Sequence, residues 1–276
     1  MGMKKFINLL ADELYRSRIF YGIVIGLVIV SQLVMVGLLI IDNRQSESNY
    51  PLNLANLIDN NGIYRVLLIA AFLLFFAYSA FTWFREWSGD SSFIIRLMTL
   101  PGNRFTIVLA KLASVFLMMG GVMFTQLCMI FLINCFAGIL LGDGAYSALP
   151  IAYAYAQTLS TTYFVMPMSV ASAALIYGGL LWIVLGIFLV VVTYMQSYQE
   201  SYVKAFGKVV LLLIANGAWL VGMIIVVESM NLVASEIFNV FVVFILVGIV
   251  LNLAQLARRI NVKPRKHVIN HKEETV

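Results

Sequence analysis

Charged side chains are scarce in this chain: Asp, Glu, Lys and Arg together make up 11% of its 276 residues, whereas hydrophobic residues make up 62%. An average soluble domain has about a quarter charged residues and about half apolar residues. The composition therefore excludes an ordinary soluble enzyme, a nucleic-acid-binding domain and a disordered chain. The mean hydropathy of +0.95 reflects apolar runs of about 20 residues, the length that crosses a bilayer as a helix.

Residues and motifs that bind metals or nucleotides are also few. The two cysteines, Cys128 and Cys135, lie seven residues apart in one apolar run, too far apart for a disulfide within one helix, and we expect both to be small buried apolar residues. No cysteine accompanies the two histidines, His267 and His271, to complete a metal site. The sequence contains neither the G-x-x-x-x-G-K-[ST] loop that binds ATP nor an H-E-x-x-H motif. We therefore expect no catalytic residue, bound cofactor or metal in this chain.

Six apolar runs are long enough to span a membrane, and no ten-residue alternating pattern typical of a β-barrel recurs. The fold class we predict is an all-α membrane protein with an N-terminal amphipathic interfacial helix and six transmembrane helices. It forms one transmembrane domain over residues 1–260, followed by a basic tail at 261–276. The predicted spans are Ile19–Ile41, Tyr64–Phe84, Phe105–Leu140, Pro167–Met195, Phe206–Val227 and Ile237–Ala257.

The basic residues predict the orientation. With the N-terminus inside, 16 of the 18 Lys and Arg residues are cytoplasmic, and Arg44 and Arg65 are outside, as the positive-inside rule requires. We expect a multi-pass protein of the cell membrane with both termini in the cytoplasm. The basic tail either anchors this topology or binds anionic lipids. The cytoplasmic set is Lys4, Lys5, Arg16, Arg18, Arg85, Arg96, Arg104, Lys111, Lys204, Lys208, Arg258, Arg259, Lys263, Arg265, Lys266 and Lys272.

The segment before the first span, residues 3–18, has helical spacing. Its apolar residues form one stripe, and Lys4, Lys5 and Asp12 lie opposite. This pattern predicts a helix in the cytoplasmic interface. The alternatives are a plain membrane anchor or an N-terminal extension of the first span. The stripe consists of Met3, Phe6, Ile7, Leu10 and Leu14.

A short cytoplasmic helix is predicted between the second and third spans, over residues 88–101. Gly89 can end the preceding helix, Asp90 or Ser91 can cap the new one, and Pro101-Gly102 ends it. An apolar cluster on such a helix suits docking into a groove of another protein. The alternative is a helix that lies on the membrane surface. The cluster consists of Phe93, Ile94, Leu97 and Leu100.

The same region resembles the ABC-2 type family of ABC-transporter permeases. The resemblance rests on Glu86 at the exit of the second span, then Leu100-Pro101-Gly102-Asn103-Arg104, then Lys111-Leu112 at the start of the third span. In outline it covers the whole chain, because the family has an interfacial helix, six spans and both ends inside. It is specific only over about residues 85–112.

The resemblance implies a half-transporter. Two permeases, a second copy or a paralogue, enclose a pathway for an amphipathic cargo such as an antimicrobial peptide, drug or lipid, and membrane lipids surround them. Two cytoplasmic ABC ATPase subunits bind ATP and Mg, and no nucleic acid takes part. A different class of function is a membrane scaffold or sensor that recruits a cytoplasmic partner without moving cargo. The residues implied in coupling to the ATPase are Glu86, Phe93, Ile94, Arg96, Leu97, Leu100 and Arg104.

Polar and small residues inside the predicted spans are the remaining candidates. Polar groups in a membrane are costly, so they either line a pathway or form hydrogen bonds between helices. Because no charged residue lies near the centre of a span, an ion-coupled transporter is disfavoured. Small residues at Gly22 and Gly26, and at Gly178, Gly179 and Gly186, predict close helix contacts. The polar candidates are Gln126, Asn134, Asn216 and Asn252.

Overall fold

The computed structural model describes six long segments and a few single residues of this chain. These are residues 2–45, 62–88, 104–141, 170–198, 201–229 and 234–260, with Asn53, Leu54, Ile58, Tyr146, Pro150, Tyr153, Pro167 and Ser169.

In the described segments the chain is α-helical, and six helices are long and apolar enough to cross a membrane. This confirms the prediction of an all-α protein with six spans. Each predicted span lies within one helix, except that the fourth helix begins three residues after Pro167. The helices are α1 (Gly2–Gln45), α2 (Gly62–Ser88), α4 (Phe105–Leu141), α7 (Val170–Tyr198), α8 (Tyr202–Ser229) and α9 (Ala234–Ile260).

The start of α7 shows why Pro167 does not begin the helix. The hydroxyl of Ser169 accepts a hydrogen bond from the backbone N–H of Ser172 at 3.1 Å, and the Ser169 N–H donates to the Ser172 hydroxyl, also at 3.1 Å. This reciprocal pair satisfies two N–H groups that a helix start leaves without an intrahelical partner. Ser169 is therefore the N-cap, and the proline precedes it.

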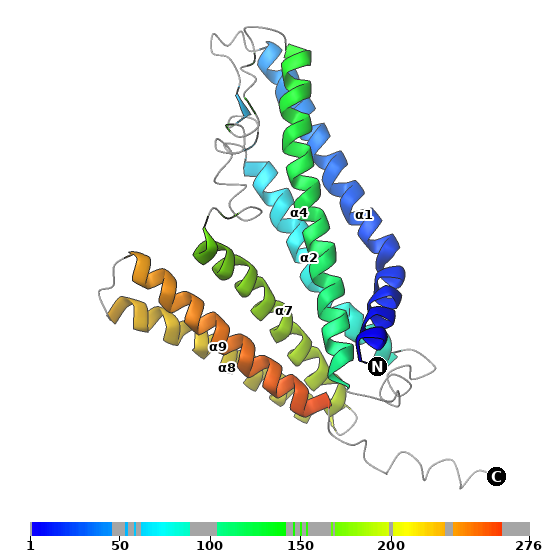
Figure 1. The fold of residues 1–276 in the computed structure, drawn as a ribbon, viewed down its shortest axis with the longest axis vertical. Helices are drawn as coiled ribbons and strands as arrows, with labels where there is room; N and C mark the ends of the chain where they lie inside the picture. Colours follow the sequence, from blue (N-terminus) through cyan, green and yellow to red (C-terminus); the bar gives the residue numbers. More distant parts are fainter. Residues whose placement is uncertain are drawn as a thin grey trace, which may run out of the picture.

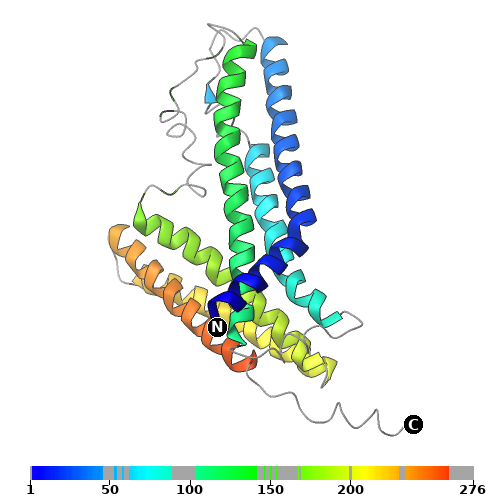
Figure 2. The ribbon, with the colours of Figure 1, turned by 45° about the vertical axis from the view of Figure 1, so that its right-hand side comes forward.

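The N-terminal segment is not a separate helix, because residues 3–18 form the beginning of α1. Figure 2 shows this first part running at an angle to the rest of α1. The predicted apolar stripe is its packing face only in part: Met3 is 78% exposed and Ile7 is 55% exposed, whereas Leu14 packs against the apolar core. Instead, Glu13 and Ser17 are buried, and they continue into the buried face of the span at Val24. The segment is an extension of the first span, one of the alternatives above.

The helices form two groups of three. In one group α1 packs mainly on α4 and also contacts α2, and in the other α7 packs on α8 and α9. Contacts between α2 and α7 join the groups. Figure 1 shows that the groups come together near the N-terminus and diverge toward the other side of the molecule. The starts of α1, α4 and α8 and the ends of α2, α7 and α9 share this converging side, which we call the basic end.

Two apolar clusters hold the helices together. The larger one includes residues of all six helices, and its junction between the groups contains the ring of Trp83 packed edge-on to Phe188, with centroids 5.6 Å apart. The smaller one lies at the opposite end of α1, α2 and α4, where Leu54, Ile58 and Tyr64 are fully buried. An aromatic pair of this kind adds about 0.5–1.5 kcal/mol beyond the area it buries.

Two expectations about small side chains are corrected. Cys128 and Cys135 are free thiols on the exposed face of α4, not buried residues. A Cβ placed at Gly22 or Gly26 meets no heavy atom of the described residues within 4 Å, so these two glycines form no close contact within the chain. Hydropathy does not separate the two environments, because lipid is as apolar as a protein core.

The glycines of α7 differ in their contacts. A Cβ at Gly178 lies 3.1 Å from Ile245 of α9, and one at Gly186 lies 3.9 Å from the amide nitrogen of Asn252, an ordinary contact. A Cβ at Gly179 meets no heavy atom of the described residues within 4 Å. The predicted close contact is thus confirmed at Gly178, where a side chain would crowd α9.

Candidate functional site

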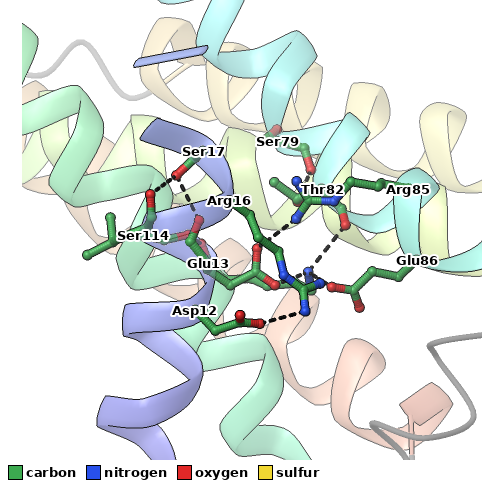
Figure 3. A network of polar contacts seen from close by, with 11 residues as sticks. Asp12, Glu13, Arg16, Ser17, Ser79, Thr82, Arg85, Glu86 and Ser114 are labelled. Carbon is green, nitrogen blue, oxygen red and sulfur yellow. Dashed lines mark hydrogen bonds and ion pairs between the residues drawn. The ribbon is translucent and has the colours of Figure 1, made fainter. Parts of the chain in front are cut away.

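Four charged residues from three helices meet inside the protein near the basic end. We call Glu13 of α1, Arg85 and Glu86 of α2, and Lys111 of α4 the charge cluster. The ammonium of Lys111 lies 2.6 Å from Oε1 of Glu13 and 2.7 Å from Oε1 of Glu86, and Arg85 Nη2 lies 3.3 Å from Oε2 of Glu13. Figure 3 shows the side chains of Glu13 and Glu86 reaching the same space from different helices.

Lys111 is the centre of the charge cluster. Its side chain is 0% exposed, and it also donates to the backbone carbonyl of Thr82 at 3.2 Å. A lysine ammonium has three N–H donors, and here Glu13, Glu86 and Thr82 supply three acceptors. The ammonium additionally lies 5.4 Å from the centre of the Trp83 ring, within range of a cation–π interaction. Every donor of this buried cation is therefore used.

The charge cluster is balanced, with two carboxylates against two cations. Transfer of each charge out of water costs several kcal/mol, so a buried pair adds little net stability, whereas removal of one partner leaves an uncompensated charge. Such groups specify one arrangement of the helices more than they stabilise it. In this protein the arrangement they specify is the contact of α1 with the end of α2 and the start of α4.

The charge cluster has residues on both sides of the segment predicted to dock on a partner. Glu86 lies in the last turn of α2, which ends at Ser88, and Lys111 lies near the start of α4, which begins at Phe105. We call residues 89–103, between these helices, the connecting segment. The candidates Phe93, Ile94, Arg96, Leu97 and Leu100 fall in it and lie outside the described residues.

The two described members of the predicted coupling set lie apart from each other. Glu86 is 1% exposed and faces Lys111, so within this chain it contacts the interior. Arg104, just before α4, places Nη1 3.5 Å from the backbone carbonyl of Ile260 at the end of α9. Gln196 of α7 donates to the carbonyl of Arg259 at 3.0 Å. The basic end therefore ties α4 and α7 to the last turn of α9.

Sequence reasoning missed Glu13 and the burial of Lys111. The charge pattern places Lys111 among the cytoplasmic residues and the resemblance places it at the start of the third span, and the structure shows it buried within α4. The sequence contained one usable signal for Glu13: with Ser17 and Val24 it follows the i, i+4, i+11 spacing of one helix face. This face of α1 packs against the other helices, although its first residue, Glu13, carries a carboxylate.

A second polar cluster lies farther along α1, α2 and α4. The carbonyl oxygen of Gln126 accepts hydrogen bonds from the amide of Gln32 at 2.8 Å and from the hydroxyl of Tyr64 at 2.9 Å. All three residues are buried, with exposures of 0–2%. Interhelical hydrogen bonds of this kind contribute about 0.6–2 kcal/mol each. The structure thus places Gln126 in a contact between helices.

The other polar candidates also bond within the chain. Asn134 accepts a hydrogen bond from the hydroxyl of Tyr146 at 2.9 Å. Burial raises the pKa of Tyr146 to about 12, so this hydroxyl stays protonated as a donor near neutral pH. Asn252 of α9 and Asn216 of α8 are joined by a long contact of 3.5 Å, and Asn216 also bonds the carbonyl of Leu212 in its own helix. The contact between Asn216 and Asn252 cross-links α8 and α9.

An open apolar groove of about 400 Å³ lies between α2, α7 and α8. Phe81 and Phe84 of α2 form one side and are about half exposed. Its surface is almost entirely apolar, so it suits a hydrocarbon chain or an aromatic group. The lining residues are Ala80, Phe81, Phe84, Val190, Val191, Tyr194, Met195 and Val209.

Comparison with protein families gives a match to the model described as ABC-2 family transporter protein, over residues 14–197. The matched range is more than half of the chain and runs from α1 to the last turn of α7, so it includes Arg85, Glu86 and Lys111. No curated protein and no solved structure matches the chain.

Proposed function

Because the chain belongs to the ABC-2 family of transporter proteins, we propose that it is the permease of an ATP-driven exporter whose ATPase subunits are separate chains. Two cytoplasmic ABC ATPases bind ATP and Mg, and two permeases, identical or paralogous, enclose the pathway. The basic end faces the cytoplasm in this proposal, as the distribution of Lys and Arg predicts. This chain contributes the path through the membrane and no nucleotide-binding loop.

The observation that carries the proposal is the position of the charge cluster at both ends of the connecting segment. A docking helix between α2 and α4 transmits a displacement only if the helix ends that hold it resist separation. Lys111 of α4 is bonded to Glu86 of α2 inside the protein, and this pair resists separation because both charges are buried. In this proposal Phe93, Ile94, Leu97 and Leu100 enter a groove of the ATPase, with Arg96 and Arg104 beside them.

We propose an amphipathic cargo, such as an antimicrobial peptide, a drug or a lipid. The apolar groove lined by Phe81 and Phe84 supports a cargo with a hydrophobic part, because it offers half-exposed aromatic rings next to lipid. The transport direction in this proposal is export, which removes such molecules from the membrane or the cytoplasm. The hydrophobic part of this cargo rests on the chemistry of the groove, and the rest of the cargo class rests on the resemblance to the family.

The test is co-expression with an ABC ATPase encoded beside this protein, affinity purification, and measurement of ATP hydrolysis in lipid. We expect a stable complex that hydrolyses ATP, and we expect Leu97→Asp to abolish it, because a charge in an apolar docking face is costly. Thr99→Asp is the matched control, since helical spacing puts Thr99 on the opposite side of the predicted docking helix.

Two results oppose the proposal. If well-folded permease brings down no ATPase, the scaffold or sensor function becomes the better explanation. If Leu97→Asp and Thr99→Asp behave alike, the docking assignment of the apolar cluster is wrong. Candidate amphipathic peptides separate the two classes of function further, since only a transporter is expected to change its ATP turnover when cargo is added.

A further inference from the structure

Glu13 connects one helix to two others at once. Its Oε1 accepts from Lys111 of α4 and its Oε2 accepts from Arg85 of α2, so both carboxylate oxygens are used. The residue is only 6% exposed, although it lies in the N-terminal part of α1 that begins at an exposed Met3. Its neighbour Asp12 pairs with Arg16 on the exposed surface of the same helix. The two adjacent acids therefore have opposite surroundings.

We propose that Glu13 is a positioning residue that ties the N-terminal part of α1 to both ends of the connecting segment, so that a movement driven by ATP at residues 89–103 is passed to α1 as well. The inference rests on the proposed function, because it requires that the connecting segment docks on the ATPase. It adds a third helix to the coupling path and assigns the connection to one carboxylate.

The geometry shows how the movement passes. The connecting segment leaves α2 just after Arg85 and Glu86, and it enters α4 shortly before Lys111. Glu13 is bonded to a residue on each of these two helix ends. A displacement of either end therefore moves the carboxylate of Glu13, unless a buried ion pair breaks. Separating such a pair leaves uncompensated charges inside the protein, which is strongly unfavourable, so α1 is expected to move with the segment.

The N-terminal part of α1 has an exposed side and a packed side. Ile7 is 55% exposed, whereas Leu14 packs against the apolar core and gives the segment a contact without directional bonds. The hydroxyl of Ser17 bonds the carbonyls of Glu13 and Leu14 in α1 itself. The ion pairs of Glu13 give the segment directional bonds to both α2 and α4, and bonds of this kind can transmit a displacement.

Glu13→Gln in the full permease–ATPase complex is the central test. Glutamine keeps the shape of the side chain and removes its charge, and Lys111 and Glu86 remain paired. Arg85, whose side chain is 27% exposed, can then turn to water. Asp12→Asn is the matched control, because it neutralises the adjacent acid on the exposed surface.

The measurement is hydrogen–deuterium exchange of the complex with and without ATP plus vanadate. In the wild type we expect ATP to change the exchange of residues 89–103 and of residues 3–12. In Glu13→Gln the change at 89–103 remains, while the change at 3–12 is lost. Asp12→Asn retains both changes.

The double variant Glu13→Gln with Arg85→Gln separates loss of the tie from an unbalanced charge. It leaves Lys111 and Glu86 as a neutral pair, so a defect caused only by the unpaired arginine disappears. We expect the double variant to stay uncoupled at residues 3–12, and recovery of the wild-type response overturns the inference.

The inference and the proposed function fail in different ways. If the wild-type complex shows no ATP-dependent change at residues 89–103, the docking function itself is wrong, and the inference falls with it. If that change is present and residues 3–12 respond equally in the wild type and in Glu13→Gln, the docking function stands and Glu13 is not the tie.

Discussion

At the scale of single residues, Lys111 decides the organisation of the first three helices. It is a fully buried cation whose three donors all have acceptors on α1 and α2. An intact buried ion pair adds little net stability, whereas removal of one partner leaves a costly uncompensated charge. Lys111 therefore fixes the position of α4 relative to α1 and α2.

We predict that Lys111→Met destabilises the protein by about 3–5 kcal/mol, because it leaves the carboxylates of Glu13 and Glu86 buried without their shared cation. The measurement is thermal unfolding in detergent, followed by size-exclusion chromatography. Lys204→Met is the control: this lysine is exposed in the first turn of α8, and its loss is expected to change stability by less than about 0.5 kcal/mol. Equal destabilisation by both variants contradicts the role of the cluster.

At the scale of helices, the contact between α7 and α9 depends on the absence of a side chain. Trp182 of α7 lies against Gly248 of α9, and a Cβ at Gly248 comes within 2.9 Å of the indole Nε1 and 3.2 Å of Cε2. The ring is bulky and meets this space with three of its atoms, so it cannot move away by a single rotation of its tip. The glycine thus sets how closely the two helices approach.

We predict that Gly248→Ala destabilises the protein by about 1–3 kcal/mol, the usual cost of overpacking. Gly179→Ala, on α7, is the matched control: a Cβ there meets no heavy atom of the described residues within 4 Å. It is expected to be neutral or to stabilise the helix by up to about 1 kcal/mol, because alanine is the better helix former. The assignment of Gly248 is wrong if both variants show the same melting temperature.

At the scale of the whole molecule, the two groups of helices meet at the basic end and diverge from it. The helix ends that are predicted to be cytoplasmic all lie at the basic end. The fold therefore agrees with the alternating path through the membrane that the charge distribution predicts. We predict that a bilayer separates this end from the connection between α1 and α2. The orientation of that arrangement in the membrane is a prediction of the charges.

We predict that a cysteine at Ser201, at the basic end, is reached by a membrane-impermeant thiol reagent only from the cytoplasm, and that one at Ser48 is reached from outside. Both are placed in a background in which Cys128 and Cys135 are alanine, since these are free thiols on the surface of α4. The background without cysteines is the control for specific labelling. The reverse labelling pattern refutes the predicted topology.

The number of spans was predictable because a bilayer imposes a minimum length on apolar sequence, whereas the continuation of residues 3–18 into α1 was not. The start of α7 at Val170 was not, since the cap depends on a reciprocal bond between Ser169 and Ser172. Among the polar candidates, the sequence identified Gln126, and the structure supplied its partners Gln32 and Tyr64. The connecting segment and its candidates stay predictions.

The sequence by itself determined six apolar runs of membrane-spanning length and the asymmetry of basic residues, because both follow from local composition, and the residues around 85–112 carry the resemblance to a permease family. Only the tertiary structure decided which helix faces pack. In lipid an apolar residue gains little from a protein neighbour over a hydrocarbon one, so hydropathy did not distinguish the exposed Cys128 from a buried residue. The pairing of Glu13 with Lys111 joins positions 98 residues apart, and it exists only because α1 and α4 lie side by side.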